Sequence, residues 1–538
     1  MKKYTNILLI AMMALMNSCL NEDLKDQLYE EDIYNNANNI YINAVAVLYN
    51  YIGGSVDSEG LQGTCRGVYD YNTLTTDEAM IPIRGGDWYD GGLWENMYLH
   101  QWNANDLPLY NTWKYLYKVV VLSNKSLSVI DTYGHLLNED QKNAYQAEIR
   151  AIRALFYYYI MDMYGRIPLV TSYNEMQDDV RQSERSEVLR FIVNELQEVV
   201  ASLPDEHSNM MGNHYGRITA PVVHFLLAKL TLNAEIYCDD DWTDSIRQNG
   251  RELFFQVDGE QLNAWEACIR YCDKLAESGY VLEKDYSYNF AVHNENSSEN
   301  IFTIPLDKNF YAAQFHYLFR SRHYNHGGAL GGASENGTSA TVSTVLSYGY
   351  GTDHVDARFE KNFYAGQVVV DGKIVKLDSG EPLEYKPLEL KLNLTGSPYV
   401  KTAGARMAKY EVDRTSYSDG RQPDNDIVLF RYADVLLMKA EAKVRNGEDG
   451  SLELNQVRSR VGMPDRNATL ENILEERLLE LVWEGWRRQD LIRFGRFHQS
   501  YDQRKQLTDE ANGYTTVFPI PQKCIDLNPR LEQHVGYK

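Results

Sequence analysis

The stretch RYADVLLMKAEAKVRNG, residues 431–447, decides the fold class of this 538-residue chain. Its apolar residues recur at spacings of three and four, which places them on one face of an α-helix. The small residues Ala433 and Ala440 on that face let a neighbouring helix approach closely, and Gly447 is a natural C-terminal stop. The stretch therefore predicts a helix that packs against other helices.

The same spacing recurs in three other parts of the chain. Residues 147–163 carry two apolar stripes, which predicts a helix buried on two sides. Residues 220–237 carry one stripe with a weaker opposite face, and Thr469 is expected to cap a further helix that runs through Val482. These helices resemble tetratricopeptide-type helix pairs, although no strict repeat is visible.

Two regions, about 53–103 and 281–425, are instead rich in Gly, Asn, Ser and Tyr, which is typical of loops. Within the second region, residues 368–375 indicate a β-hairpin around Asp371-Gly372. We therefore predict a mostly α fold: a tetratricopeptide-like helix-pair scaffold, mainly in 30–52, 106–280 and 426–500, with minor β-hairpins. Ligands commonly bind to loops that such a scaffold positions.

The N-terminus has the pattern of a lipoprotein signal peptide. Lys2 and Lys3 precede an apolar run that is too short to span a bilayer, and the small Ser18 stands directly before Cys19. We expect residues 1–18 to be cleaved and Cys19 to carry acyl chains that hold residues 19–538 at a membrane. The alternative is an ordinary secretory signal with Cys19 near the cut by chance. The following Glu22-Asp23 resembles the acidic export signal of Bacteroidetes surface lipoproteins.

Composition narrows the ligand class. The net charge is −23 and no basic stripe appears, so nucleic acid is not an expected partner. Tyrosine is in large excess, 40 against 16 Phe, which favours recognition of a polar ligand with apolar faces. The cysteines other than Cys19 are scattered, so we predict no disulfide framework, no structural metal and no cofactor.

No motif of a metalloprotease, a serine hydrolase or a phosphate-binding loop is present in the sequence. The glycine-rich residues 327–332 lack the lysine of a phosphate loop and read as a flexible loop. Glycoside hydrolysis needs only two suitably placed carboxylates, which no spacing in the sequence excludes. A hydrolase therefore stays an alternative to a binding protein.

The pair Trp88-Tyr89, between two Gly-Gly dipeptides, is the sharpest ligand-binding candidate, because such a loop offers ring faces to solvent or ligand. The alternative is a loop that folds its own rings inward. A second candidate is the cluster His316, His323 and His326 among tyrosines, which suits either a hydroxyl-rich ligand or, alternatively, a metal.

Several motifs together resemble the SusD/RagB family of Bacteroidetes outer-membrane lipoproteins, and they span nearly the whole mature chain. They are 76–78 (TDE), 148–156 (EIRAIRALF), 164–168 (YGRIP), 431–442, 454–460 (LNQVRSR), 484–495 (EGWRRQDLIRFG), 518–521 (FPIP) and 536–537.

This resemblance implies a lid on a SusC-like TonB-dependent transporter that binds glycans, or in some members peptides, outside the cell and catalyses no reaction. It implies a lipid anchor facing the cell exterior. It makes Trp88 a stacking platform, with Arg84 and Asp87 as hydroxyl partners. Tyr89 and a second region with Tyr311, Tyr324 and Asn325 complete the expected contacts.

The aromatic-rich stretch that follows the TDE motif in starch-binding members is replaced here by residues 79–83, so starch is not supported. We expect the most recognisable motif residues, Arg487, Arg488 and Asp490, to make helix packing and ion pairs. A peptide-binding member of the family and, less favoured, a surface glycoside hydrolase are the alternatives.

Overall fold

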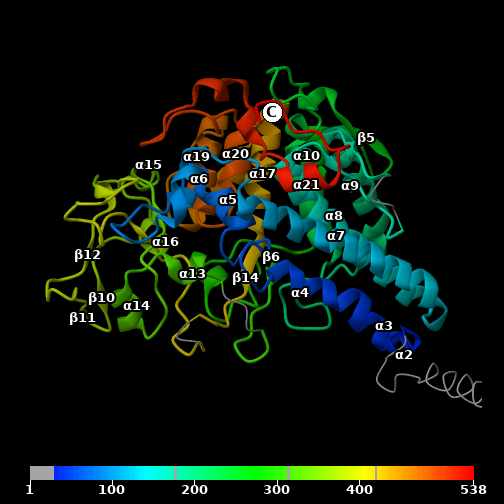
Figure 1. Cartoon of the computed structure of the whole chain (residues 1–538), viewed down its shortest axis with the longest axis horizontal. Helices are drawn as coiled ribbons and strands as arrows, with labels where there is room; N and C mark the ends of the chain where they lie inside the picture. The colour runs from blue at the N-terminus through cyan, green and yellow to red at the C-terminus, as the bar shows by residue number, and fades with distance from the viewer. Residues whose placement is uncertain (1–29, 63, 175–178, 312–314, 418–420, 538) are drawn as a thin grey trace, which may run out of the picture.

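The computed structural model describes residues 30–62, 64–174, 179–311, 315–417 and 421–537 (Figure 1). The predicted signal peptide and the lipidation site at Cys19 lie outside the described residues. The fold is mostly α-helical with short strand pairs, as the sequence predicts. In Figure 1 the long helices occupy the centre and the right, and the short strands and loops of residues 320–400 lie at the left.

Long helices form the scaffold by packing side by side in nearly the order of the chain. Contacts link α7 to α8, α8 to α9, α9 to α10, α10 to α12, and α12 to α17, which also contacts α18 and α19. This arrangement is the expected set of helix pairs. Their bounds are α7 Leu107–Tyr133, α8 Glu139–Tyr164, α9 Arg185–Val199, α10 Ala220–Leu232, α12 Ala264–Glu277, α17 Tyr432–Asn446, α18 Ser451–Arg460, α19 Leu470–Leu481 and α20 Arg487–Arg493.

The helix ends follow the sequence signals. Helix α17 stops at Gly447, whose φ of 90° is the left-handed conformation that glycine adopts without a steric penalty. Helix α19 begins after Thr469, whose hydroxyl accepts a hydrogen bond from the amide of Asn472 at 3.1 Å. In α8 every residue from Ala147 to Tyr164 except Arg150 is buried, which confirms burial on two sides.

The prediction for residues 220–237 is wrong in two respects. The segment is two helices, α10 and α11 (Ala234–Tyr237), which meet at Asn233. In addition, α10 is buried on all sides except at His224, because α9, α12, α17 and strand β6 all pack around it. The less apolar face of α10 is therefore also covered by protein.

The remaining elements are short. The expected hairpin at Asp371-Gly372 is present, since β10 pairs with β11 through two residues of positive φ, 51° and 73°. Strands β6 and β14 form a fully buried antiparallel pair. The other helices are α2 Glu30–Ile33, α3 Ala37–Ile40, α4 Val47–Gly53, α5 Val68–Leu74, α6 Leu93–Tyr98, α13 Tyr317–Arg320, α14 Tyr324–Leu330, α15 Val342–Ser347, α16 Phe359–Asn362 and α21 Gln522–Leu527, with a π-helical segment η1 at Tyr41–Ala46.

Paired strands run antiparallel in every case. They are β1 Ala79–Met80 with β7 Ser339–Ala340, β2 Ile167–Pro168 with β3 Gln182–Ser183, β4 Phe254–Val257 with β5 Glu260–Asn263, β6 Asn300–Ile304 with β14 Ile427–Arg431, β8 Phe363–Tyr364 with β13 Arg406–Met407, β9 Gly366–Gln367 with β12 Glu384–Tyr385, and β10 Val369–Val370 with β11 Lys373–Ile374. Within the described ranges, no helix combines the length and the apolar character needed to cross a bilayer.

Buried ion pairs hold the C-terminal motifs in place. Arg487 pairs with Asp77 at 2.7 Å, Arg488 pairs with Asp162 at 2.8 Å, and Asp490 lies 2.8 Å from Arg477. These contacts confirm that the most recognisable motif residues are structural. They also join the TDE motif to the EGWRR motif, because Asp77 of one binds Arg487 of the other.

The last residue of the TDE motif, Glu78, makes stability depend on pH. Its carboxylate is buried and accepts a hydrogen bond from the amide of Trp483 at 2.9 Å, and burial raises its pKa to about 8. Because the folded pKa exceeds the ordinary value, this group contributes full stability below about pH 4.5, and the contribution is lost as pH rises through about 8. We expect Glu78→Gln to unfold at a higher temperature than the wild type at pH 9 and at a similar temperature at pH 5.

The measurement is the Tm of both proteins across that range by circular dichroism. The exposed Glu381 supplies the matched control, because Glu381→Gln removes a carboxylate from the surface. Parallel Tm profiles for Glu78→Gln and the wild type would refute the assignment of a raised pKa.

Candidate functional site

The loop before α6 and the segment around α13 and α14 enclose a surface cavity of about 430 Å³, which we call the Trp88 pocket. It contains two aromatic rings, both predicted from the sequence, and a rim of charged and polar groups. Its lining residues are Cys65, Arg66, Asp87, Trp88, Asp90, His316, Tyr324, Ser334, Glu335 and Arg421.

Trp88 is held in a conformation that a bulky residue rarely adopts. Its φ is 64°, and such backbone strain costs on the order of 1–3 kcal/mol, so the surrounding structure must enforce it. The indole N–H donates to the main-chain oxygen of Glu335 at 3.1 Å. Gly337 makes room for the ring, because a Cβ there would lie 2.7 Å from Trp88 Cζ2. Strain of this kind is typical of functional loops.

A second tryptophan supports the pocket from below. Trp94 is buried, meets Trp88 edge to face with ring centroids 6.1 Å apart, and donates its indole N–H to Asp90 at 2.8 Å. The guanidinium groups of Arg66 and Arg320 lie 5.5 and 5.4 Å from the Trp94 ring. These contacts make the floor of the Trp88 pocket rigid.

The polar rim offers both donors and acceptors. Arg66 is paired with Asp57 and Asp90, and His316 lies 3.1 Å from Glu335. Burial, followed by the nearby carboxylates of Asp87 and Glu335, raises the pKa of Tyr324, so its hydroxyl keeps its proton. The exposed ring of Tyr324 thus presents an apolar face and a hydrogen-bonding group together.

The thiol of the Trp88 pocket is not a reactive one. Cys65 is its only lining thiol, and burial raises the pKa of that thiol to about 12. A thiol with such a pKa stays protonated and unreactive.

The structure brings together three of the predicted contact residues, Asp87, Trp88 and Tyr324. Arg84 does not line the pocket: its buried guanidinium donates to the main-chain oxygens of Val400 and Ala403, at 3.0 Å each. Arg84 thereby fixes the start of the loop, which turns back at once because Gly85 has a φ of 71° and the amide of Arg84 donates to Asp87 O.

The other predicted contacts lie elsewhere. Tyr89 is 57% exposed and is not among the lining residues. Asn325 donates to Lys376 O and to Asp378, next to the hairpin region. Tyr311 lines a different cavity, near α4.

The histidine cluster is divided by the fold. His316 joins the Trp88 pocket, whereas His323 and His326 are buried beside the hydroxyl of Tyr385. Nowhere in the described ranges do three metal-ligating side chains come together. The predicted flexible loop at 327–332 is in part wrong, because residues up to Leu330 belong to helix α14, which ends at Gly331 in the left-handed conformation.

Sequence reasoning missed Arg66, Asp90, Ser334, Glu335 and Arg421. Arg66, Arg421 and the pair Ser334-Glu335 come from three segments that no local pattern links to Trp88, whereas Asp90 lies two residues after Trp88 in the same loop. A larger cavity of about 500 Å³ lies between α9 and strand β4, but Phe254 and Phe255 are its only aromatic lining residues. None of its described lining residues is a tryptophan or a tyrosine, whereas the Trp88 pocket has one of each.

Two family models match this chain and together cover most of it. Residues 278–537 match the model described as "SusD family", and residues 17–232 match the model described as "Starch-binding associating with outer membrane". The chain belongs to the SusD/RagB family. The second description agrees with an outer-membrane association.

Curated relatives agree with this assignment. The chain is similar to the "Starch-binding protein SusD" of Bacteroides thetaiotaomicron, with 23% identity over 90% of this chain and 89% of that protein. It is also similar to a "SusD-like protein" of Bacteroides ovatus, with 24% identity over 80% and 74% of the two chains. Family members of this kind are binding proteins, and the chain is not an enzyme.

A solved structure shows the same fold. The "Surface glycan-binding protein A" of Bacteroides thetaiotaomicron in complex with laminarihexaose superposes with a TM-score of 0.69, 20% identity and coverage of 92% of this chain and 99% of that chain. At this identity the likeness concerns the fold alone.

Proposed function

We propose that this protein is a cell-surface glycan-binding lipoprotein that captures oligo- or polysaccharide in the Trp88 pocket. The observation that carries the proposal is a strained tryptophan beside an exposed tyrosine, surrounded by groups that donate and accept hydrogen bonds. A sugar ring has apolar C–H faces and hydroxyl edges, and this pocket offers both complements. Relatives with names that specify starch or laminarihexaose binding support the glycan class.

The finer parts of the proposal concern anchoring and transport. We propose that acylated Cys19 tethers the chain to the outer membrane, facing the exterior, and that the bound glycan passes to a SusC-like TonB-dependent transporter. Membership of the family and the outer-membrane description of the matching model support this assignment. Copurification of such a transporter with the tagged protein from detergent-solubilised membranes would test it.

Native gels that contain single polysaccharides test the glycan proposal directly. We expect the purified mature chain to migrate more slowly in at least one gel of a broad panel that includes laminarin and starch, because bound polymer retards it. Free migration across the panel, together with a peptide found by mass spectrometry in the purified protein, would favour the peptide-binding alternative instead.

Prolonged incubation with the retarding polysaccharide separates binding from hydrolysis. Chromatography of the mixture should show intact polymer after a day, since no step of bond cleavage is expected. Release of oligosaccharides that persists after repeated purification would favour the glycoside hydrolase.

A further inference from the structure

A second cavity lies near the Trp88 pocket and is also lined by aromatic rings and hydrogen-bonding groups. Its volume is about 410 Å³, and the contact residue Tyr311, predicted from the sequence, lines it. We call it the Tyr311 pocket. Its other aromatic lining residues are Tyr41, Tyr49, Tyr215 and Phe310, and its polar ones include Asn50, Arg217 and Thr303.

The Tyr311 pocket is preformed. Tyr311 donates its hydroxyl to Gly54 O at 2.8 Å and fits against Gly53, where a Cβ would lie 2.3 Å from the phenol oxygen. Tyr49 donates to Glu148 at 2.7 Å, and Tyr215 donates to Asp426 at 2.6 Å. Rings locked in this way lose little conformational entropy when a ligand binds.

The electrostatics of the Tyr311 pocket favour a neutral ligand. Among its described lining residues Arg217 is the one with a basic side chain, and the guanidinium is already bound by the carboxylate of Glu148, with its Nε 3.1 Å from that carboxylate. The other described lining residues are uncharged. Phe310 stands at the rim with 90% of its surface exposed, and Asn50 is also exposed.

The two pockets are adjacent. Tyr311 lines one pocket and His316 lines the other. Because these residues are five positions apart, their Cα atoms lie at most about 18 Å from each other. Ile52 lines the Tyr311 pocket and Cys65 lines the Trp88 pocket, and the amide of Ser58, between them in the chain, donates to Cys65 O at 2.7 Å.

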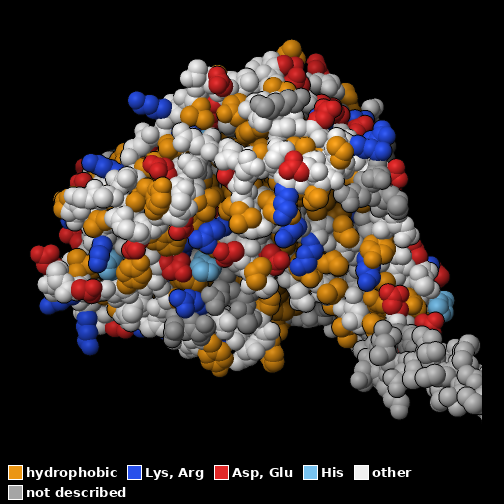
Figure 2. Space-filling view, viewed as in Figure 1, with side chains coloured by type: hydrophobic (Ala, Val, Ile, Leu, Met, Phe, Trp, Pro, Cys, Tyr) orange, Lys and Arg blue, Asp and Glu red, His pale blue; other side chains and the backbone are white. Residues whose placement is uncertain are grey.

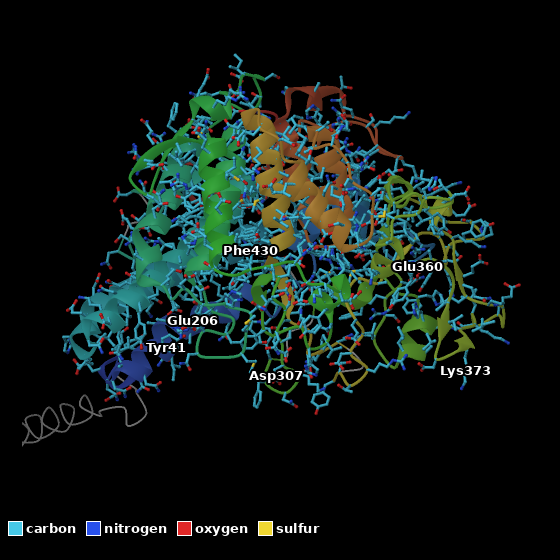
Figure 3. The ribbon with its side chains drawn as sticks, turned by 180° about the vertical axis from the view of Figure 1, so that it is seen from behind. Tyr41, Glu206, Asp307, Glu360, Lys373 and Phe430 are labelled. Atoms are coloured by element: carbon cyan, nitrogen blue, oxygen red, sulfur yellow. The ribbon has the colours of Figure 1, made fainter. Side chains whose placement is uncertain are left out.

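The Tyr311 pocket belongs to the lower part of the molecule as drawn. Figure 3 labels Tyr41 on η1 and Asp307 in the loop after β6, and both lie along the same lower edge. Figure 2 shows exposed hydrophobic side chains along this edge.

We infer that one neutral polysaccharide chain occupies both pockets, so that the Tyr311 pocket is a second subsite which selects for long ligands. This inference rests on the proposed glycan-binding function. Binding at two linked subsites raises the overall affinity, because the second contact forms at a high effective concentration once the first has formed. A ligand too short to reach both pockets gains nothing from the second one.

Phe310→Ala tests the inference, because the exposed ring contributes little to folding. The probes are the polysaccharide that retards the wild type in native gels and its size-fractionated hydrolysis fragments, measured by isothermal titration calorimetry. We expect the variant to bind the polymer and long fragments at least about tenfold more weakly, and to bind disaccharide and trisaccharide fragments as the wild type does. Asn50→Ala should show the same dependence on length.

Phe254→Ala is the matched control, since it removes a phenylalanine that is 58% exposed on β4, outside both pockets. It should bind fragments of every length like the wild type. Unchanged polymer affinity of Phe310→Ala, or an equal loss for all lengths, would overturn the second subsite while leaving the Trp88 pocket intact. Failure of the wild type to bind any glycan would overturn the proposed function as well.

Discussion

Trp88→Gly should abolish retardation by the polysaccharide while leaving the protein folded. The indole is the main apolar face of the Trp88 pocket, and loss of a central aromatic contact typically costs about 2 kcal/mol or more of binding, roughly thirtyfold in affinity. Glycine adopts the φ of 64° without strain, which offsets the loss of ring packing against Trp94 and Gly337.

This combination distinguishes a binding role from a structural one. Affinity electrophoresis and calorimetry report the binding, and thermal unfolding reports the stability. Trp88→Phe should keep part of the affinity, because it retains a ring but loses the hydrogen bond to Glu335 O. Tyr173→Ala removes a ring that is 48% exposed outside either pocket, and should bind normally. If Trp88→Gly bound the polymer as tightly as the wild type, the Trp88 pocket would not be the glycan site.

Much of the fold follows from local sequence patterns. Periodicity and capping residues predicted α8, α17 and α19 because a helix is a local structure whose ends are set by residues such as Thr469 and Gly447. The prediction for 220–237 failed because burial depends on neighbouring elements. Helix α10 is surrounded by α9 and α12, which flank it in the sequence, and by α17 and β6, which come from later parts of the chain. Periodicity records the strongest apolar face and gives no measure of how many partners surround a helix.

The candidate site shows the same division. Trp88 could be found because paired glycines around an aromatic residue are a local signal, and the structure gives Gly85, Gly91 and Gly92 positive φ angles. Arg84 stands four residues before Trp88, yet its side chain turns inward, because adjacency in sequence does not fix the direction of a side chain in a loop.

Long-range contacts could not be predicted at all. Glu335 binds both the indole N–H of Trp88 and the ring of His316, across more than 200 residues in the first case. No periodic pattern encodes such a pairing, since it depends on how separate loops pack on the scaffold.

The second large effect is expected at the centre of the scaffold, where Arg431→Met should destabilise the fold by about 3–5 kcal/mol. Arg431 is buried and binds three carboxylates, those of Glu299 at 2.8 Å, Glu480 at 2.6 Å and Glu484 at 2.7 Å. Removing one charge from such a network leaves buried carboxylates without compensation, which is the costly step. Urea unfolding followed by tryptophan fluorescence measures the loss.

The charges of the buried network around Arg431 sum to zero, and this neutrality predicts how a second substitution should act. Its cations are matched in number by its carboxylates: Arg358, Lys409, Arg431, Arg458 and Arg460 against Glu299, Asp356, Glu476, Glu480 and Glu484. Adding Glu484→Gln to Arg431→Met restores neutrality, so the double variant should be more stable than Arg431→Met alone.

Arg270→Met provides the matched control, because Arg270 pairs with Glu260 at the surface, where such pairs contribute about 1 kcal/mol or less.

The position of Arg431 links this stability to ligand binding. It ends β14 opposite Asn300, the first residue of β6, and the same strand includes Thr303 and leads into Pro305 at the Tyr311 pocket. Arg431→Met should therefore weaken polymer binding even at urea concentrations below its unfolding midpoint. If the variant lost less than about 1 kcal/mol of unfolding free energy and bound the polymer normally, hydrophobic packing alone would position the loops of the Tyr311 pocket.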